Sequence, residues 1–319
     1  MSNESSTEDL SRVSLSDAGV SLMALCLGII ISSANATTIV AIWRTPALRT
    51  LANMYVCSLA CADFFVGLTC VLVALFLLPP VKLTLFYKHI HVCFLFHGVG
   101  LGPMVISAFH MMLIAFDRYI YIMRPYFYQR VITVRVISGF IGSTWVLGVF
   151  MTFICQFIGR PYDEVPICDV TQRQPIWYTF YLIGIIYTLT SGSTVIAYVA
   201  ILRAAARQRN AVRAINVNLA QPSERAGSID KGTMKSIKFF VSVFGAFFCC
   251  ITPNIIILGL DYFIAFPAII YRLLNLLGYS NSAMNFIIYA VMNKDFRQAY
   301  LKTLCLSRCD RNDHKVCAP

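Results

Sequence analysis

Apolar residues occur along the chain in seven long runs that shorter polar segments separate. A helix needs roughly 20 apolar residues to cross the hydrocarbon core of a bilayer, and each run is long enough. The pattern predicts spans at about 18–43, 52–79, 90–122, 134–157, 175–203, 234–262 and 268–291. We therefore expect an all-α membrane protein, built as a seven-transmembrane helix bundle over residues 18–292.

Polar segments flank and connect these runs. Residues 1–17 form a Ser-rich tail without the basic region of a signal peptide, so we expect the first span to act as its own insertion signal. Two connections are long, 159–175 and the basic segment 207–231, which we predict to be a cytoplasmic loop. Residues 293–304 have apolar residues at helical spacing, which predicts a short amphipathic eighth helix before the tail at 305–319.

Composition and charge agree with a membrane protein. The chain is 58% hydrophobic and 13% charged, whereas a soluble domain is nearer half apolar and a quarter charged. All but six of the 26 Lys and Arg residues fall on the side that holds 207–231, so the net charge of +11 does not indicate a nucleic-acid partner. The excess predicts a multi-pass plasma-membrane protein with an extracellular N-terminus, where the sequon at Asn3 is a glycosylation candidate.

Charged and polar residues inside the runs are the first candidates for function. Asp117-Arg118-Tyr119 ends the third run, and a charge pair there marks either a membrane boundary or a switch. Asp63 is the only formal charge between Leu51 and Pro80. It is either a protonated residue in a polar cluster or the ligand of an ion, since a bare carboxylate at this depth is costly.

Other residues of the predicted spans favour the ion. Ser107 lies in the third span, and Asn281 and Asn285 lie on one face of the seventh because they are four residues apart. Oxygen ligands of this kind suit a small hard cation. Pro253 in the sixth span removes a backbone hydrogen bond and predicts a hinge, with a static kink as the alternative.

Four cysteines at the ends of the apolar runs or beyond them have candidate chemistry. Cys93 and Cys168 fall on the predicted extracellular side, where an oxidising compartment predicts a disulfide between them. Cys305 and Cys309 follow the eighth helix and are candidates for palmitoylation, with exposed free thiols as the alternative.

The chain resembles a rhodopsin-like (class A) G-protein-coupled receptor over about residues 18–305, without a close subfamily match. The positions that carry the resemblance are Asn35, Asp63, Cys93, Asp117-Arg118-Tyr119, Trp145, Cys168, Tyr198, Phe247, Cys250, Pro253, Asn285 and Tyr289. The resemblance implies a role in activation and G-protein coupling for Asp117, Arg118, Tyr119, Tyr198, Phe247, Pro253, Asn285 and Tyr289. It implies a sodium pocket at Asp63, Ser107, Asn281 and Asn285. It also implies a heterotrimeric G protein as partner, with arrestin as a further candidate, and contact with membrane lipid.

Several positions depart from the family pattern. Phe286 follows Asn285 where the family has a proline, Ile251 replaces the sixth-helix tryptophan, and the fifth-helix proline is replaced around Thr190. Thr233 stands where many members have a glutamate that latches the arginine, which predicts raised basal activity.

The expected ligand follows from the third span. Amine receptors resemble one another in an aspartate seven residues after the cysteine, where this chain has Gly100. The candidate pocket comprises His97, Gly100, Met104, Ile251, Asn254, Tyr271, Asn275 and Tyr279. This mostly apolar set favours an extracellular small molecule that is neutral or lipid-like, and not a classical monoamine.

Other classes of function fit less well. The five histidines are scattered and no phosphate loop or nucleophile elbow is present, so we expect no enzyme, no cofactor and no metal besides sodium. A receptor homologue that does not signal remains an alternative because of the departures above. An ion channel or transporter that uses Asp63 is a weaker one, since the chain lacks internal repeats.

Overall fold

The computed structural model describes residues 15–78, 89–158, 183–218, 224–261, 263–264 and 266–304. Seven long helices occur in these ranges: α2 (Leu15–Arg44), α3 (Leu51–Phe76), α5 (Ile90–Met123), α7 (Val134–Ile158), α9 (Gly184–Asn218), α10 (Glu224–Leu260) and α11 (Ala268–Met292). The same ranges also contain three short helices: η1 (Pro46–Leu48) between α2 and α3, α6 (Pro125–Val131) between α5 and α7, and α12 (Lys294–Leu304) after α11. The predictions at Asn3, Cys168, Cys305 and Cys309 lie outside the described residues, and so do the side chains of Cys93, His97 and Thr233.

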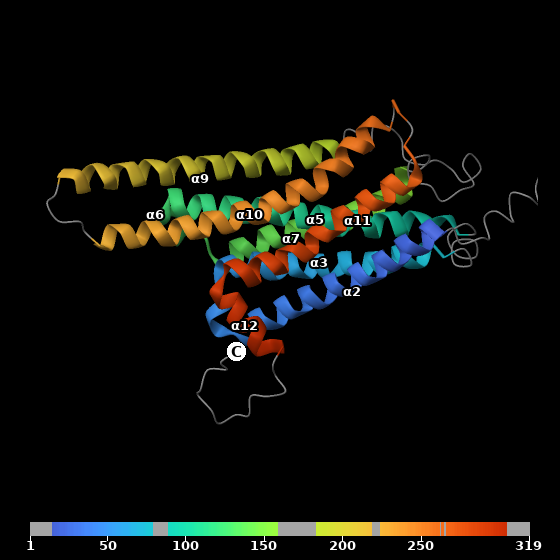
Figure 1. Ribbon diagram of the computed structural model, residues 1–319, viewed down its shortest axis with the longest axis horizontal. Helices are drawn as coiled ribbons and strands as arrows, with labels where there is room; N and C mark the ends of the chain where they lie inside the picture. Colours follow the sequence, from blue (N-terminus) through green and yellow to red (C-terminus); the bar gives the residue numbers. More distant parts are fainter. Residues whose placement is uncertain are drawn as a thin grey trace, which may run out of the picture.

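The long helices run side by side along the longest axis of the molecule (Figure 1). Six of the described helices, α2, α3, α5, α7, α9 and α10, are long and apolar enough to cross a membrane. The seventh, α11, has 25 residues, about 37 Å at 1.5 Å per residue, but does not reach the apolarity of the other six. Its polar residues include Asn281, Ser282 and Asn285, all buried inside the bundle. The predicted helical membrane bundle is confirmed.

The connection at 207–231 is mostly helical, so the predicted loop there is wrong. α9 continues to Asn218 and α10 begins at Glu224, and both extend past the rest of the bundle at the left of Figure 1. Alanines 204–206 and the Arg and Gln residues that follow are strong helix formers, and this propensity outweighs the polarity that suggested a loop.

α12 confirms the predicted short helix after the last span. It turns away from α11 and crosses the end of the bundle (Figure 1). Phe296 and Tyr300 are buried, the Tyr300 hydroxyl lies 3.0 Å from Thr38 Oγ1 of α2, and its ring stacks on Phe286 at 4.5 Å. These contacts fix α12 to both α2 and α11.

Glycines allow two helix pairs to approach very closely. A Cβ atom added at Gly98 of α5 would lie 1.7 Å from the backbone oxygen of Thr152 in α7, and one at Gly102 would lie 2.7 Å from the Gly148 oxygen. In α2 and α3, a Cβ on Gly67 would lie 3.0 Å from the Gly28 oxygen. Small residues four apart commonly permit such backbone contact between membrane helices.

Candidate functional site

Asp63 lies at the centre of the bundle and is fully buried. Its Oδ1 accepts hydrogen bonds from Ser107 Oγ of α5 at 3.1 Å and Ser282 Oγ of α11 at 2.8 Å. Its Oδ2 accepts from Asn285 Nδ2 of α11 at 2.7 Å. Three helices therefore meet at this carboxylate, and Ser282 is a contact that the predicted set omitted.

Asn281 is buried beside this cluster but shares no hydrogen bond with Asp63 in the structure. Its Oδ1 and that of Asn285 are buried without a hydrogen-bond partner within the described chain. Asn35 of α2 donates to the Ser282 backbone oxygen at 3.1 Å and so joins α2 to the same region. A buried polar atom without a partner costs free energy, so two unpaired carbonyl oxygens near a carboxylate suit a bound cation.

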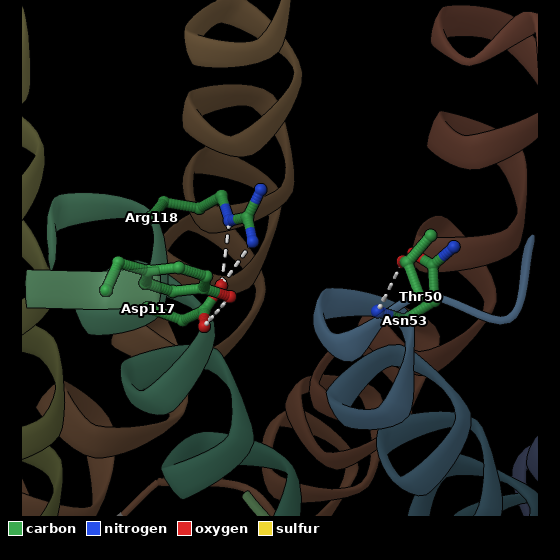
Figure 2. Close-up of polar contacts among 5 residues, drawn as sticks. Thr50, Asn53, Asp117 and Arg118 are labelled. Carbon is green, nitrogen blue, oxygen red and sulfur yellow. Dashed lines mark hydrogen bonds and ion pairs between the residues drawn. The ribbon is translucent and has the colours of Figure 1, made fainter. Parts of the chain in front are cut away.

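Asp117 and Arg118 form an ion pair at the end of α5 (Figure 2). Arg118 Nε donates to Asp117 Oδ2 at 2.9 Å, and the hydroxyl of Tyr128, in α6, donates to Asp117 Oδ1 at 2.9 Å. Burial and the charge of Asp117 raise the pKa of Tyr128 to about 12, so this donor stays protonated at neutral pH. Thr50 caps the neighbouring α3 by accepting from the Asn53 backbone N–H at 3.3 Å. Tyr119 packs with α9 next to this pair.

Aromatic residues fill the space between α9, α10 and α11 near this end. Tyr198 and Phe247 are buried, and Phe244 lies between them with ring centroids 6.0 Å and 6.2 Å away. Tyr289 is buried and packs against Phe296 of α12 at 5.2 Å. The residues expected to rearrange on activation therefore form one packed layer, in which Phe244 joins Tyr198 to the core that holds Phe247 and Tyr289.

Pro253 lies inside α10, as predicted, and a hydrogen bond beside it connects α10 to α9. Thr252 Oγ1 donates to the Phe248 backbone oxygen at 2.6 Å. Because that bond uses the Thr252 hydrogen, the Tyr187 hydroxyl of α9 donates to Thr252 Oγ1, at 2.5 Å. Pro103 likewise lies inside a helix, α5, which continues through it.

His110 forms a second buried network, also missed from the sequence. Its Nδ1 lies 2.8 Å from the Ile106 backbone oxygen, which can only accept, so Nδ1 carries the proton. Nε2, 2.8 Å from Ser58 Oγ, is then the acceptor, and Ser58 accepts in turn from Trp145 Nε1 at 2.9 Å. The imidazole of His110 thus connects α3, α5 and α7 through Ser58 and Trp145.

The candidate ligand residues lie at the opposite end from Arg118. A Cβ on Gly100 would lie 3.5 Å from the Tyr279 hydroxyl, so an aspartate there would be next to a donor. Asn254 Nδ2 donates to Asn275 Oδ1 at 2.8 Å, which joins α10 to α11. Tyr271 donates to Asp261 at the same end.

Known proteins resemble this chain over most of its length. The sequence model of the family described as 7 transmembrane receptor (rhodopsin family) matches residues 34–289. A histamine H2 receptor from Cavia porcellus is 25% identical over 93% of this chain and 82% of that receptor. The octopamine receptor beta-2R of Drosophila melanogaster is 26% identical over 86% of this chain and 59% of its own length. The 5-hydroxytryptamine receptor 4 of Rattus norvegicus is 26% identical over 88% of this chain and 74% of that receptor.

Proposed function

Because the chain belongs to the rhodopsin family of seven-transmembrane receptors, we propose that it transmits the binding of an extracellular neutral small molecule to a heterotrimeric G protein. Membership in the family makes it a multi-pass membrane receptor rather than an enzyme or a channel. We place the ligand at the Gly100 end of the bundle and the G protein at the Arg118 end. We also propose plasma-membrane localisation, with the N-terminus outside and arrestin as a second partner.

The observation that carries the proposed coupling is the arrangement around Arg118. Asp117, fixed by Tyr128, holds Arg118 beside the packed layer of Tyr198 and Phe247. α10 has a proline hinge above this layer and a long basic extension beyond it. An outward swing of α10 about Pro253 would separate Phe247 from its neighbours and open a cleft next to Arg118.

The proposed coupling can be tested without a known ligand. We expect purified receptor in lipid nanodiscs to accelerate nucleotide exchange on at least one class of purified heterotrimeric G protein, because Thr233 provides no acidic latch. Arg118→Ala should return exchange to the receptor-free rate while the thermal unfolding midpoint stays close to that of wild type. A receptor that accelerates exchange on no class of G protein would instead be a homologue that does not signal.

A sodium ion fits the cluster around Asp63. Asp63, Ser107, Asn285, Ser282 and the unpaired oxygen of Asn281 are the groups that would hold it. They combine one carboxylate with neutral oxygens, the ligand set that small hard cations prefer. When bound, the ion would neutralise the one buried carboxylate of the membrane interior in the described chain.

The choice of a neutral ligand depends on Gly100. The relatives named above are receptors for amines, and this chain lacks the carboxylate that would pair with a protonated amine at the expected position. Both acidic groups that the structure describes at this end have partners: Asp17 with Arg272, and Asp261 with Tyr271. At Gly100 itself, a protonated amine would have no carboxylate to pair with, and burying an unpaired charge is costly.

Gly100→Asp should give the receptor affinity for amines. The new carboxylate would lie beside the Tyr279 hydroxyl and pair with a protonated amine, and a hydrogen bond to a charged group contributes about 1.5–3 kcal/mol, or roughly 10- to 100-fold in Kd. The measurement is the concentration dependence of thermal stabilisation by tyramine. The control is Gly100→Asn, whose side chain has the shape of aspartate without its charge, and tyramine should not stabilise this variant. If wild type bound tyramine as tightly as Gly100→Asp, the neutral-ligand proposal would be refuted.

A further inference from the structure

Asn254 and Asn275 form a side-chain amide pair between two helices at the proposed ligand end. Asn254 lies near the end of α10 and Asn275 near the start of α11, and these two helices pack against each other (Figure 1). One hydrogen bond, from Asn254 Nδ2 to Asn275 Oδ1 at 2.8 Å, joins them. Asn275 is exposed and Asn254 is half-buried.

The pair leaves one whole NH₂ group and one carbonyl oxygen without a protein partner. Asn254 Oδ1 and Asn275 Nδ2 make no hydrogen bond to any described residue. If both amides were turned over, the bond would run in the other direction and would still leave one carbonyl oxygen and one NH₂ group. The donor–acceptor character of this edge therefore does not depend on how the two amides are oriented.

An apolar surface lies next to the amide pair. A Cβ on Gly278 of α11 would lie 3.6 Å from Ile251 Cδ1, 3.6 Å from Met104 Cε and 3.7 Å from Asn254 Nδ2. These are ordinary contact distances, so an alanine fits at 278, whereas a larger side chain would press on all three neighbours. Ile251 is the residue that replaces the family's tryptophan, so the side chain here is smaller than in most members.

We propose that this amide pair is the polar recognition element of the ligand site, and that it binds a neutral molecule with an N–H and a C=O adjacent in cis on an apolar body. A lactam, an imide or the edge of a nucleobase has this arrangement. The ligand N–H donates to Asn254 Oδ1 and its carbonyl accepts from Asn275 Nδ2, while the apolar body packs on Met104 and Ile251. The inference rests on the proposed ligand site and names its ligand class.

The first test compares three probes on purified full-length receptor: 6-hexyl-2-piperidone, its N-methyl derivative, and the lactone with the same ring and chain. Only the first has both the N–H and the C=O. We expect the lactam to raise the thermal unfolding midpoint with an apparent Kd at least tenfold lower than that of either analogue. Equal affinities, or no stabilisation by the lactam, would overturn the proposal.

The second test uses a substitution that keeps the shape of the amide pair but changes which ligand it should prefer. Asn275→Asp presents a second acceptor beside Asn254 Oδ1, so it should lose at least tenfold in lactam affinity. It should gain affinity for the corresponding cyclic amidine, a cation with N–H donors on both nitrogens. Gly278→Ala should retain lactam binding and Gly278→Leu should abolish it. Unchanged lactam affinity in Asn275→Asp would assign the binding to another surface and overturn the proposal.

These measurements do not depend on signalling. Thermal stabilisation reports binding whether or not the receptor accelerates nucleotide exchange, so failure of the proposed coupling and failure of amide recognition give different results. A receptor that binds the lactam selectively but activates no G protein would support the ligand class alone.

Discussion

Gly98→Val is expected to reduce folded receptor at the cell surface to roughly a tenth of the wild-type level. The first added carbon would lie 1.7 Å from the Thr152 backbone oxygen, and backbone atoms cannot move aside as a flexible side chain can. α5 and α7 would have to separate along the contact that Gly102 and Gly148 share. Overpacking of this kind costs about 3 kcal/mol, a large share of the 5–15 kcal/mol that typically stabilises a protein.

The matched control is Gly142→Val in α7. A Cβ at Gly142 meets nothing within 4 Å, so the same substitution adds the same strain to the helix without a clash. Surface staining of an N-terminally tagged receptor and the unfolding midpoint in detergent both measure the difference. Equal losses in Gly98→Val and Gly142→Val would mean that helix propensity, and not the close contact, determines the effect.

Asp63→Asn is expected to abolish the response of the receptor to sodium. In wild type, NaCl should raise the unfolding midpoint relative to choline chloride at the same ionic strength, since an ion that binds only the folded state stabilises it. Sodium should also weaken binding of an activating ligand by about fivefold or more, the usual range of coupling between two sites, because outward motion of α10 is expected to disrupt the cluster. The asparagine keeps the shape of Asp63 but not its charge.

Asn281→Ala separates ion binding from packing. It removes an unpaired oxygen but no hydrogen bond to Asp63, so it should weaken the sodium response and leave stability in choline chloride close to that of wild type. Ser282→Ala, which removes a donor to Asp63, should also lower stability in choline chloride. If NaCl and choline chloride gave equal midpoints in wild type, the cluster would be a packing element only.

Much of this arrangement could be predicted because polar residues stand out against apolar runs. Asp63 attracts attention as a charge in a predicted span, and the four-residue spacing of Asn281 and Asn285 places both on the buried face of α11. The hydrogen-bond partners could not be predicted in the same way. Ser282 bonds to Asp63 whereas Asn281 does not, and this depends on the rotation of α11 about its axis, which spacing alone does not determine.

Contacts between ordinary residues of different helices could not be predicted from one sequence. His110, Ser58 and Trp145 come from three spans, and nothing in their local sequence indicates that they meet. The close approach of α5 and α7 is similar: Gly98 and Gly102 have the spacing of a helix-packing motif, but their partner Thr152 emerges only from the tertiary structure. The helix at 207–218 has a local cause, because the helix propensity of its Ala, Arg and Gln residues outweighs their polarity.

The limited apolarity of α11 has a consequence for biosynthesis. Asn281, Ser282 and Asn285 face Asp63 and its neighbours in the finished bundle, but each would lose those partners if α11 entered the bilayer alone. Among the described spans α11 is also the last to leave the ribosome, so its polar face can be satisfied only by helices that have already assembled. We therefore expect insertion of α11 to depend on prior assembly of α2, α3 and α5, so that a chain with misassembled early spans would leave α11 outside the membrane.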